Sequence, residues 1–277
     1  MRKSKVIIAF LMVILSFGLI GCAPVNDALV KMGFKNNDFE FMKNNKVNQI
    51  VIQNTRDIGF RFIVTDPKVI EDIYKILSDG NPETEKSTLE PDYIFEIQTG
   101  DTVRKYDYVV GDPESGKGNF YDKDKAYRVP KDLDQTILNN LSFIKKPRDF
   151  YNIYYGSILK VVEGVKGQLD GQKIGVDILG DIDCVKYLFS VDLGDFQKQL
   201  QKVVPSAEVL NSKSNKNDYD AIISVQNRGY NSDTFKTIIT VDDKKKNIYE
   251  KYYVLGKYEF KNWDIKVGDV NEKPEGW

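Results

Sequence analysis

The feature that most constrains the fold is the alternation of apolar and polar residues in short segments separated by turns. Tyr93, Phe95 and Ile97 alternate with polar neighbours, which is typical of a strand with one face in solvent. Similar runs predict strands at 47–53, 58–65, 92–98, 102–110, 173–179, 186–191, 221–226, 234–241, 247–255 and 258–267. Thr99, Gly100 and Asp101 predict a hairpin turn. Because hairpins join antiparallel strands, this spacing favours antiparallel sheets over a parallel sheet of βα repeats.

Amphipathic segments between these strands predict helices. Asp66 and Pro67 indicate a helix start, because aspartate at the N-cap accepts hydrogen bonds from free amides and proline is tolerated at the first helical position. The expected apolar face of that helix consists of Val69, Ile70, Ile73, Ile76 and Leu77. Further helices are expected at 130–144, from Arg148 onward, and from a cap at Asp192 to Val204. The predicted fold class is therefore α+β, with mainly antiparallel sheets and packed amphipathic helices.

Glycine-rich and polar segments suggest a division of the chain. Gly164, Gly167 and Gly171 mark a candidate boundary, after which a strand followed by a helix recurs. Asp192, Phe196, Leu200 and Val203 repeat the spacing of Asp66, Ile70, Tyr74 and Leu77. The halves are therefore either related modules or alike by coincidence. The expected segments are a signal peptide at 1–21, a tether at 22–45, a first α+β module at 46–147, a bridging helix with a glycine-rich linker at 148–170, a second α+β module at 171–268 and a loose tail at 269–277.

The N-terminus has the pattern of an export signal. Arg2, Lys3 and Lys5 precede an uncharged apolar run at 6–20, which is shorter than the roughly 20 residues that a membrane-spanning helix needs. The segment Leu19-Ile20-Gly21-Cys22 resembles the lipobox of bacterial lipoproteins. That resemblance implies cleavage before Cys22, attachment of lipid to its thiol, and anchoring on the extracytoplasmic face of the cell membrane. The alternative is an uncleaved helix that happens to contain a cysteine.

Two short motifs extend this resemblance. With the lipobox, Thr65-Asp66-Pro67 and Pro91-Asp92-Tyr93 make the chain similar to uncharacterised surface lipoproteins of low-GC Gram-positive bacteria. The resemblance implies a location at the membrane and assigns one residue, Cys22, as the site of lipid attachment.

The composition excludes several kinds of chemistry. The chain contains no histidine, which removes Ser-His-Asp and Cys-His catalysis and zinc sites that rely on imidazole. Its two cysteines are Cys22 and Cys184, so lipidation of the first leaves the second without a disulfide partner. Removal of residues 1–21 changes the net charge from −1 to −4, whereas nucleic-acid-binding faces are usually strongly cationic. We therefore expect no nucleic acid, cofactor or metal.

Two further patterns could indicate a nucleotide site or a calcium site. Residues 111–118 nearly spell a phosphate-loop motif, but Gly118 stands where a magnesium-binding hydroxyl is required. Acidic residues occur at Asp112, Glu114, Asp122 and Asp124, and again at Asp181 and Asp183, without the spacing of an EF-hand. We interpret these segments as solvated turns and expect no nucleotide site.

Tyrosines in the last predicted hairpin are the candidate binding residues. Consecutive residues of a strand face opposite sides of the sheet, so one of Tyr252 and Tyr253 is expected in the core and the other at the surface. Exposed aromatic side chains are effective anchors for partners. We therefore expect non-catalytic binding of a protein, peptide or cell-wall glycan, with no catalytic residue. The alternative is a carboxylate-based hydrolase acting on envelope material, which needs two acids about 5–9 Å apart.

Overall fold

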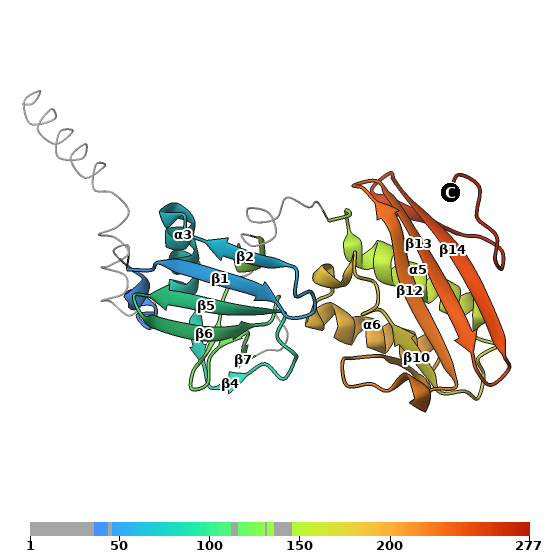
Figure 1. Cartoon of the computed structure of the whole chain (residues 1–277), viewed down its shortest axis with the longest axis horizontal. Helices are drawn as coiled ribbons and strands as arrows, with labels where there is room; N and C mark the ends of the chain where they lie inside the picture. Colours follow the sequence, from blue (N-terminus) through green and yellow to red (C-terminus); the bar gives the residue numbers. More distant parts are fainter. Residues whose placement is uncertain (1–35, 44–45, 112–115, 131, 136–145) are drawn as a thin grey trace, which may run out of the picture.

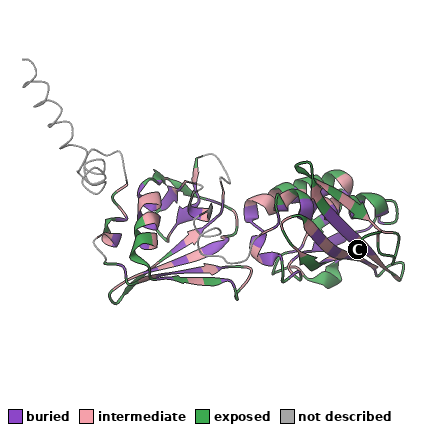
Figure 2. Cartoon of the chain, turned by 90° about the horizontal axis from the view of Figure 1, so that it is seen from above, coloured by how far each residue is buried: buried purple, intermediate pink, exposed green. Residues whose placement is uncertain are grey.

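The computed structural model describes residues 36–43, 46–111, 116–130, 132–135 and 146–277. It contains two units that lie side by side along the long axis of the molecule, each with its own sheet (Figure 1). Buried residues gather inside each unit, in two separate main cores (Figure 2). Both units combine helices with mostly antiparallel strands, so the predicted α+β class is confirmed.

The first unit is built on a seven-stranded sheet in the order β2-β1-β5-β6-β8-β9-β3, in which every pair is antiparallel. Its strands are β1 (Gln49–Asn54), β2 (Arg61–Val64), β3 (Asn81–Glu83), β5 (Tyr93–Thr99), β6 (Thr102–Tyr108), β8 (Phe120–Tyr121) and β9 (Ala126–Arg128). A small parallel pair, β4 (Glu85–Lys86) with β7 (Lys117–Gly118), lies beside it. Its helical segments are η1 (Glu40–Met42), α3 (Pro67–Ser78) and α4 (Asp132–Gln135).

Helix α3 begins where its sequence predicts. The Oδ1 atom of Asp66 accepts hydrogen bonds from the amides of Lys68 at 2.8 Å and Val69 at 3.1 Å. Ile73 and Leu77 are fully buried in the first core, which agrees with the predicted apolar face. Of the helix expected at 130–144, the described part is α4, and residues 136–145 lie outside the described residues.

The second unit is built on a six-stranded sheet in the order β11-β10-β12-β13-β14-β15. Its strands are β10 (Ile174–Asp177), β11 (Ala207–Val209), β12 (Ala221–Tyr230), β13 (Thr234–Asp243), β14 (Ile248–Glu259) and β15 (Asn262–Val267). Strand β10 is parallel to both of its neighbours, and the other pairs are antiparallel. Its helical segments are α5 (Phe150–Val165), η3 (Val185–Tyr187), α6 (Ser190–Val203) and η4 (Lys216–Asp218). The two sheets differ in strand order and direction, so the equal spacing of the two helix starts is not accompanied by a shared sheet topology.

Helix α5 packs in the second core, although the sequence suggested a bridge between the halves. Phe150, Ile158 and Val162 are buried in this core together with residues of the sheet. Gly164 lies in the last turn of α5, Gly167 and Gly171 lie in the connection from α5 to β10, and both elements contribute to the same core. Two residues of this half pack with the first unit: Phe189 belongs to the first core, and Val191 packs against a small cluster of Val109, Tyr121 and Ala126.

The entrance to α6 differs from the prediction. Residues 186–191 were expected to form a strand, but they contain the end of η3 and the start of α6. The helix begins at Ser190, with Phe189 as its N-cap residue, and Asp192 lies within the first turn. The Ser190 amide donates to Asp92 Oδ1 at 2.9 Å, and the Arg56 guanidinium donates to both Asp92 and the Ser190 hydroxyl. The first unit therefore supplies the carboxylate at the start of this helix.

Candidate binding site

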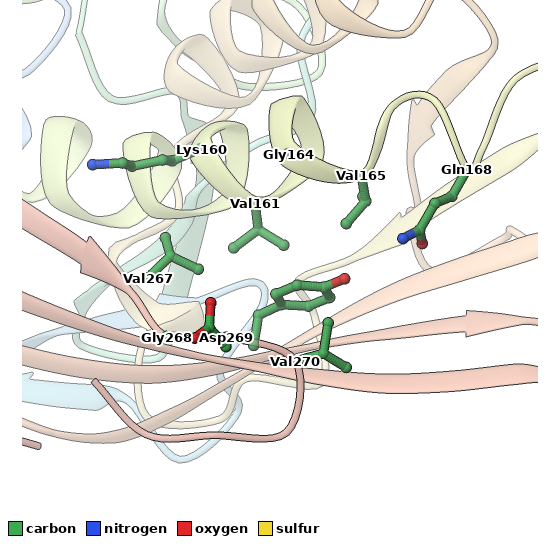
Figure 3. Close-up of a pocket in the computed structure, with 10 residues that line it drawn as sticks. Lys160, Val161, Gly164, Val165, Gln168, Val267, Gly268, Asp269 and Val270 are labelled. Carbon is green, nitrogen blue, oxygen red and sulfur yellow. The ribbon is translucent and has the colours of Figure 1, made fainter. Parts of the chain in front are cut away.

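A cavity of about 370 Å³ lies between α5, the last two strands and the segment that follows them. Figure 3 shows Val161 and Val165 pointing from α5 into this space, with Val267 and Val270 on its other side. The lining residues are Lys160, Val161, Gly164, Val165, Gln168, Tyr252, Val267, Gly268, Asp269 and Val270. The site therefore combines one turn of a helix with the end of an edge strand.

Local geometry explains how these side chains meet. Val161 and Val165 are four residues apart on α5, so they lie on the same face of the helix. Tyr252 is on the face of β14 that packs against α5, and it is only 7% exposed. Strand β15 is brought alongside by a two-residue turn at Phe260 and Lys261, whose φ angles of 51° and 65° are those of a tight hairpin turn.

The walls of the cavity are apolar and its rim is polar. The Tyr252 hydroxyl donates to Glu250 at 2.8 Å. Burial, helped by the hydrogen bond to Glu250, raises the pKa of Tyr252 to about 12, so this side chain stays protonated at physiological pH. Lys160, Gln168 and Asp269 supply the polar groups, and Lys160 Nζ donates to the Ile265 carbonyl at 2.5 Å. Such a site can hold an apolar side chain of a partner, while the polar groups of that partner stay in solvent.

Tyr253 lies on the opposite face of β14, as the alternation predicted. It is half-buried rather than open, because the Trp277 ring packs edge-on against it with ring centroids 5.2 Å apart. The tail expected to be loose is attached to the sheet: the Gly268 amide donates to Tyr253 O at 2.9 Å, and the Asn271 amide donates to Lys251 O at 2.8 Å. Of the two candidate tyrosines, Tyr252 lines the cavity and Tyr253 is covered by the tail.

A second cavity, of about 530 Å³, lies at the end of α5 and beside the end of α6. Its lining consists of Lys166, Gly167, Leu169, Asp170, Gly171 and residues 203–206. Each cavity is lined by one carboxylate, Asp269 in the first and Asp170 in the second. Neither therefore contains the pair of acids that a glycosidase-like mechanism requires.

Carboxylates with raised pKa values occur elsewhere in the structure. Burial raises the pKa of Asp181 and of Asp192 to about 6. Neither residue lines either cavity. Cys184 is buried, and burial raises the pKa of its thiol, so it is not an activated nucleophile. Across the described ranges, no group of three or more Cys, Asp or Glu side chains is placed to hold a metal ion.

The other candidates from the sequence are placed as follows. Cys22, Asp112 and Glu114 lie outside the described residues. Asp122 accepts hydrogen bonds from the amides of Asp124 and Lys125 at 2.8 Å, as expected of a solvated turn. The residues that sequence reasoning missed are those of α5 and β15 around Tyr252. Their signal was the pair Val161 and Val165 with Gly164 between them, but this pattern does not reveal which strand lies opposite.

The fold and the site define a two-unit α+β protein with an apolar surface cavity beside a sheet edge. Residues 43–147 are similar to a family whose model is described as YhfM protein. This match covers the first unit from residue 43 onward and less than half of the chain. No curated protein and no solved structure matches the chain. Within the part that the structure describes, no helix is long and apolar enough to span a membrane.

Proposed function

We propose that this chain is a lipid-anchored protein on the extracytoplasmic face of the cell membrane, attached through Cys22, and that its second unit binds a protein or peptide partner without catalysis. The observation that carries the binding role is the apolar cavity at Tyr252 beside the last strand. The lipobox-like segment ending in Cys22 supports the anchor. An anchored protein with an apolar side-chain site is suited to hold a partner close to the membrane.

The chemistry of the site favours binding over hydrolysis. Tyr252 stays protonated, Lys160 is hydrogen-bonded to a backbone carbonyl, and Asp269 is the one carboxylate in the lining. None of these groups has a neighbour in the cavity that would make it a general base. Asp181 and Asp192, whose raised pKa values suit acid catalysis, line neither cavity. No observation therefore favours the hydrolase alternative.

A capture experiment with matched leucine variants tests this proposal. The soluble chain 23–277 is immobilised, incubated with envelope extract, and its bound proteins are quantified by mass spectrometry. A Cβ at Gly164 meets no atom within 4 Å, so Gly164→Leu adds an apolar side chain to the lining of the cavity at a position where the Cβ has room. Gly194→Leu, on α6, is the control, because its Cβ also meets no atom within 4 Å and it lines neither cavity.

We expect the wild-type chain and Gly194→Leu to recover the same partner, and Gly164→Leu to recover about tenfold less. Equal recovery by Gly164→Leu would show that the cavity is not the binding site. If the wild-type chain instead hydrolyses purified cell wall and Asp192→Asn abolishes this activity, the hydrolase alternative is correct.

A further inference from the structure

Strand β15 has one edge that pairs with β14 and one edge that faces away from the sheet. Glu259 and Asn262 flank the two-residue turn, so their pair is hydrogen-bonded and the pairs alternate from there. The Gly268 amide donates to Tyr253 O at 2.9 Å, which continues the same series. The amides and carbonyls of Trp263, Ile265 and Val267 therefore point outward, and the bond from Lys160 to the Ile265 carbonyl confirms this direction.

The opposite edge of the same sheet is closed. Gln197 of α6 donates from Nε2 to the Ala207 carbonyl at 2.9 Å and accepts from the Val209 amide at 2.7 Å. One side chain thus satisfies two outward groups of β11, and the outward Ala207 amide donates to the Val204 carbonyl at 3.0 Å. On β15, among the described residues, only the Ile265 carbonyl has such a partner, in the side chain of Lys160. Exposed strand edges of this kind are templates for another strand.

We infer that β15 is a docking strand for an extended peptide segment of a partner protein, which adds to the sheet as a further strand and inserts an apolar side chain into the cavity beside Val267. This inference rests on the proposed function and gives the chemistry of the partner. Backbone groups of the peptide pair with the outward groups of Trp263, Ile265 and Val267. Every second side chain of the peptide faces α5 and the cavity, so the peptide alternates apolar with polar residues.

A second copy of this chain fits the site less well. In an edge-to-edge pair, the other copy would offer Trp263, Ile265 and Val267, whose side chains already pack in its own core. They could not enter the cavity, which would stay unfilled. The exposed face of β15 carries both an acid, Asp264, and a base, Lys266, so it does not select a strongly charged peptide. The edge strands of the first sheet, β2 and β3, have only four and three residues, and neither borders a cavity described above.

Hydrogen exchange on the soluble chain 23–277 tests the docking strand directly. The probes are short synthetic peptides in which valine or isoleucine alternates with threonine or lysine. Each peptide is also made in two N-methylated forms. One form is methylated at the odd-numbered amides and the other at the even-numbered amides, which point to opposite edges of an extended strand. In the free protein, the amides of Trp263, Ile265 and Val267 should exchange faster than those of Asp264 and Lys266. A bound peptide should slow exchange at the first three by about tenfold or more, and only one N-methylated form should lose binding.

Variants at Ile265 separate the backbone from the side chain. Ile265→Pro removes an outward amide, and proline is tolerated at an edge position whose N–H faces solvent. We expect Ile265→Pro to weaken peptide binding by about tenfold and Ile265→Ala, which keeps the amide, to change it much less. The wild-type exchange measurements remain decisive if the proline variant does not fold.

Three results would overturn the inference. The first is that no peptide slows exchange at the three outward amides, and the second is that both N-methylated forms bind equally. The third is a homodimer that Ile265→Pro dissociates, since it would make a second copy the occupant. If the capture experiment recovers a partner that Gly164→Leu loses and Ile265→Pro retains, the proposed function stands and strand addition is wrong.

Discussion

Replacing Asp92 by asparagine tests how strongly the two units depend on each other. Asp92 is fully buried and its carboxylate accepts hydrogen bonds from three donors: the Arg56 guanidinium at 2.5 Å, the Val110 amide at 2.8 Å and the Ser190 amide at 2.9 Å. Arg56 and Val110 belong to the first unit, whereas Ser190 begins α6 of the second. Burial raises the pKa of Asp92, and the Arg56 guanidinium opposes this shift. The substitution Asp92→Asn keeps the shape and removes the charge.

The expected cost follows from what the asparagine cannot do. It offers one oxygen to three donors, so at least one N–H loses its acceptor and faces an amide N–H₂ group. The Arg56 side chain, which is 9% exposed, also loses its counter-charge. Removing one partner of a buried ion pair costs about 3–5 kcal/mol. Because domains are stable by about 5–15 kcal/mol, Asp92→Asn should lower the free energy of unfolding by a large fraction and weaken the link between the units.

Urea unfolding followed with two probes measures this effect. Both tryptophans, Trp263 and Trp277, lie in the second unit, so their fluorescence follows that unit alone. Hydrogen exchange of the backbone amides in β1 reports the unfolding of the first unit. In the wild-type chain the two transitions should coincide, and in Asp92→Asn they should shift to lower urea and separate. Asp243→Asn is the control, because this buried carboxylate lies wholly within the second unit and accepts from Gln172 at 2.9 Å. If Asp92→Asn unfolds at the same urea concentration as the wild-type chain, the reasoning is wrong.

Two other predictions concern a buried acid and the anchor. Burial raises the pKa of Asp181 from 3.8 to about 6, so its contribution to stability is present at low pH and is lost as pH rises through about 6. The free energy of unfolding, measured by urea titration at several pH values, should therefore fall by up to about 3 kcal/mol between pH 4 and 7 on this account. Asp181→Asn should flatten that dependence, and an unchanged profile would contradict the assignment. For the anchor, Cys22→Ser should abolish metabolic labelling with palmitate and processing before residue 22, whereas continued labelling would exclude lipidation at this residue.

The parts of the fold that the sequence predicts are those whose causes are local. The start of α3 is predictable because Asp66 accepts from amides only two and three residues further on. The opposite faces of Tyr252 and Tyr253 are predictable because a strand alternates strictly. In both cases the residues that decide the structure lie within the same short segment.

The predicted position of the last hairpin turn was wrong, because the residue that decides it is distant in the sequence. A break was expected between Leu255 and Tyr258, where Gly256 interrupts the apolar pattern, but β14 continues to Glu259. A Cβ at Gly256 would lie 2.3 Å from Ile153 Cδ1 of α5. This glycine therefore allows the helix to approach the strand. Nothing near Gly256 in the sequence distinguishes such a position from a turn.

The start of α6 and the candidate site were missed for the same physical reason. The Ser190 amide is satisfied by Asp92, which lies 98 residues earlier in the chain. Likewise, Tyr252 acquires its cavity from Val161 and Val165, which belong to a helix far from it in sequence. Propensity and periodicity describe how a segment folds, and they contain no information on which distant segment it meets.

The first unit and the second unit differ in whether the family model covers them and in whether they contain the candidate site. The family match ends at residue 147, just before Phe150 begins α5, so the cavity and the β15 edge belong to the part of the chain that the family model does not cover. In the sequence, the first unit comes between the N-terminal segment and the second unit. If Cys22 carries lipid as we propose, the whole first unit lies between the anchor and the docking strand along the chain. The bonds that join Asp92 to Arg56 and Ser190 then become functional as well as structural, because they fix the direction in which β15 is presented to a partner.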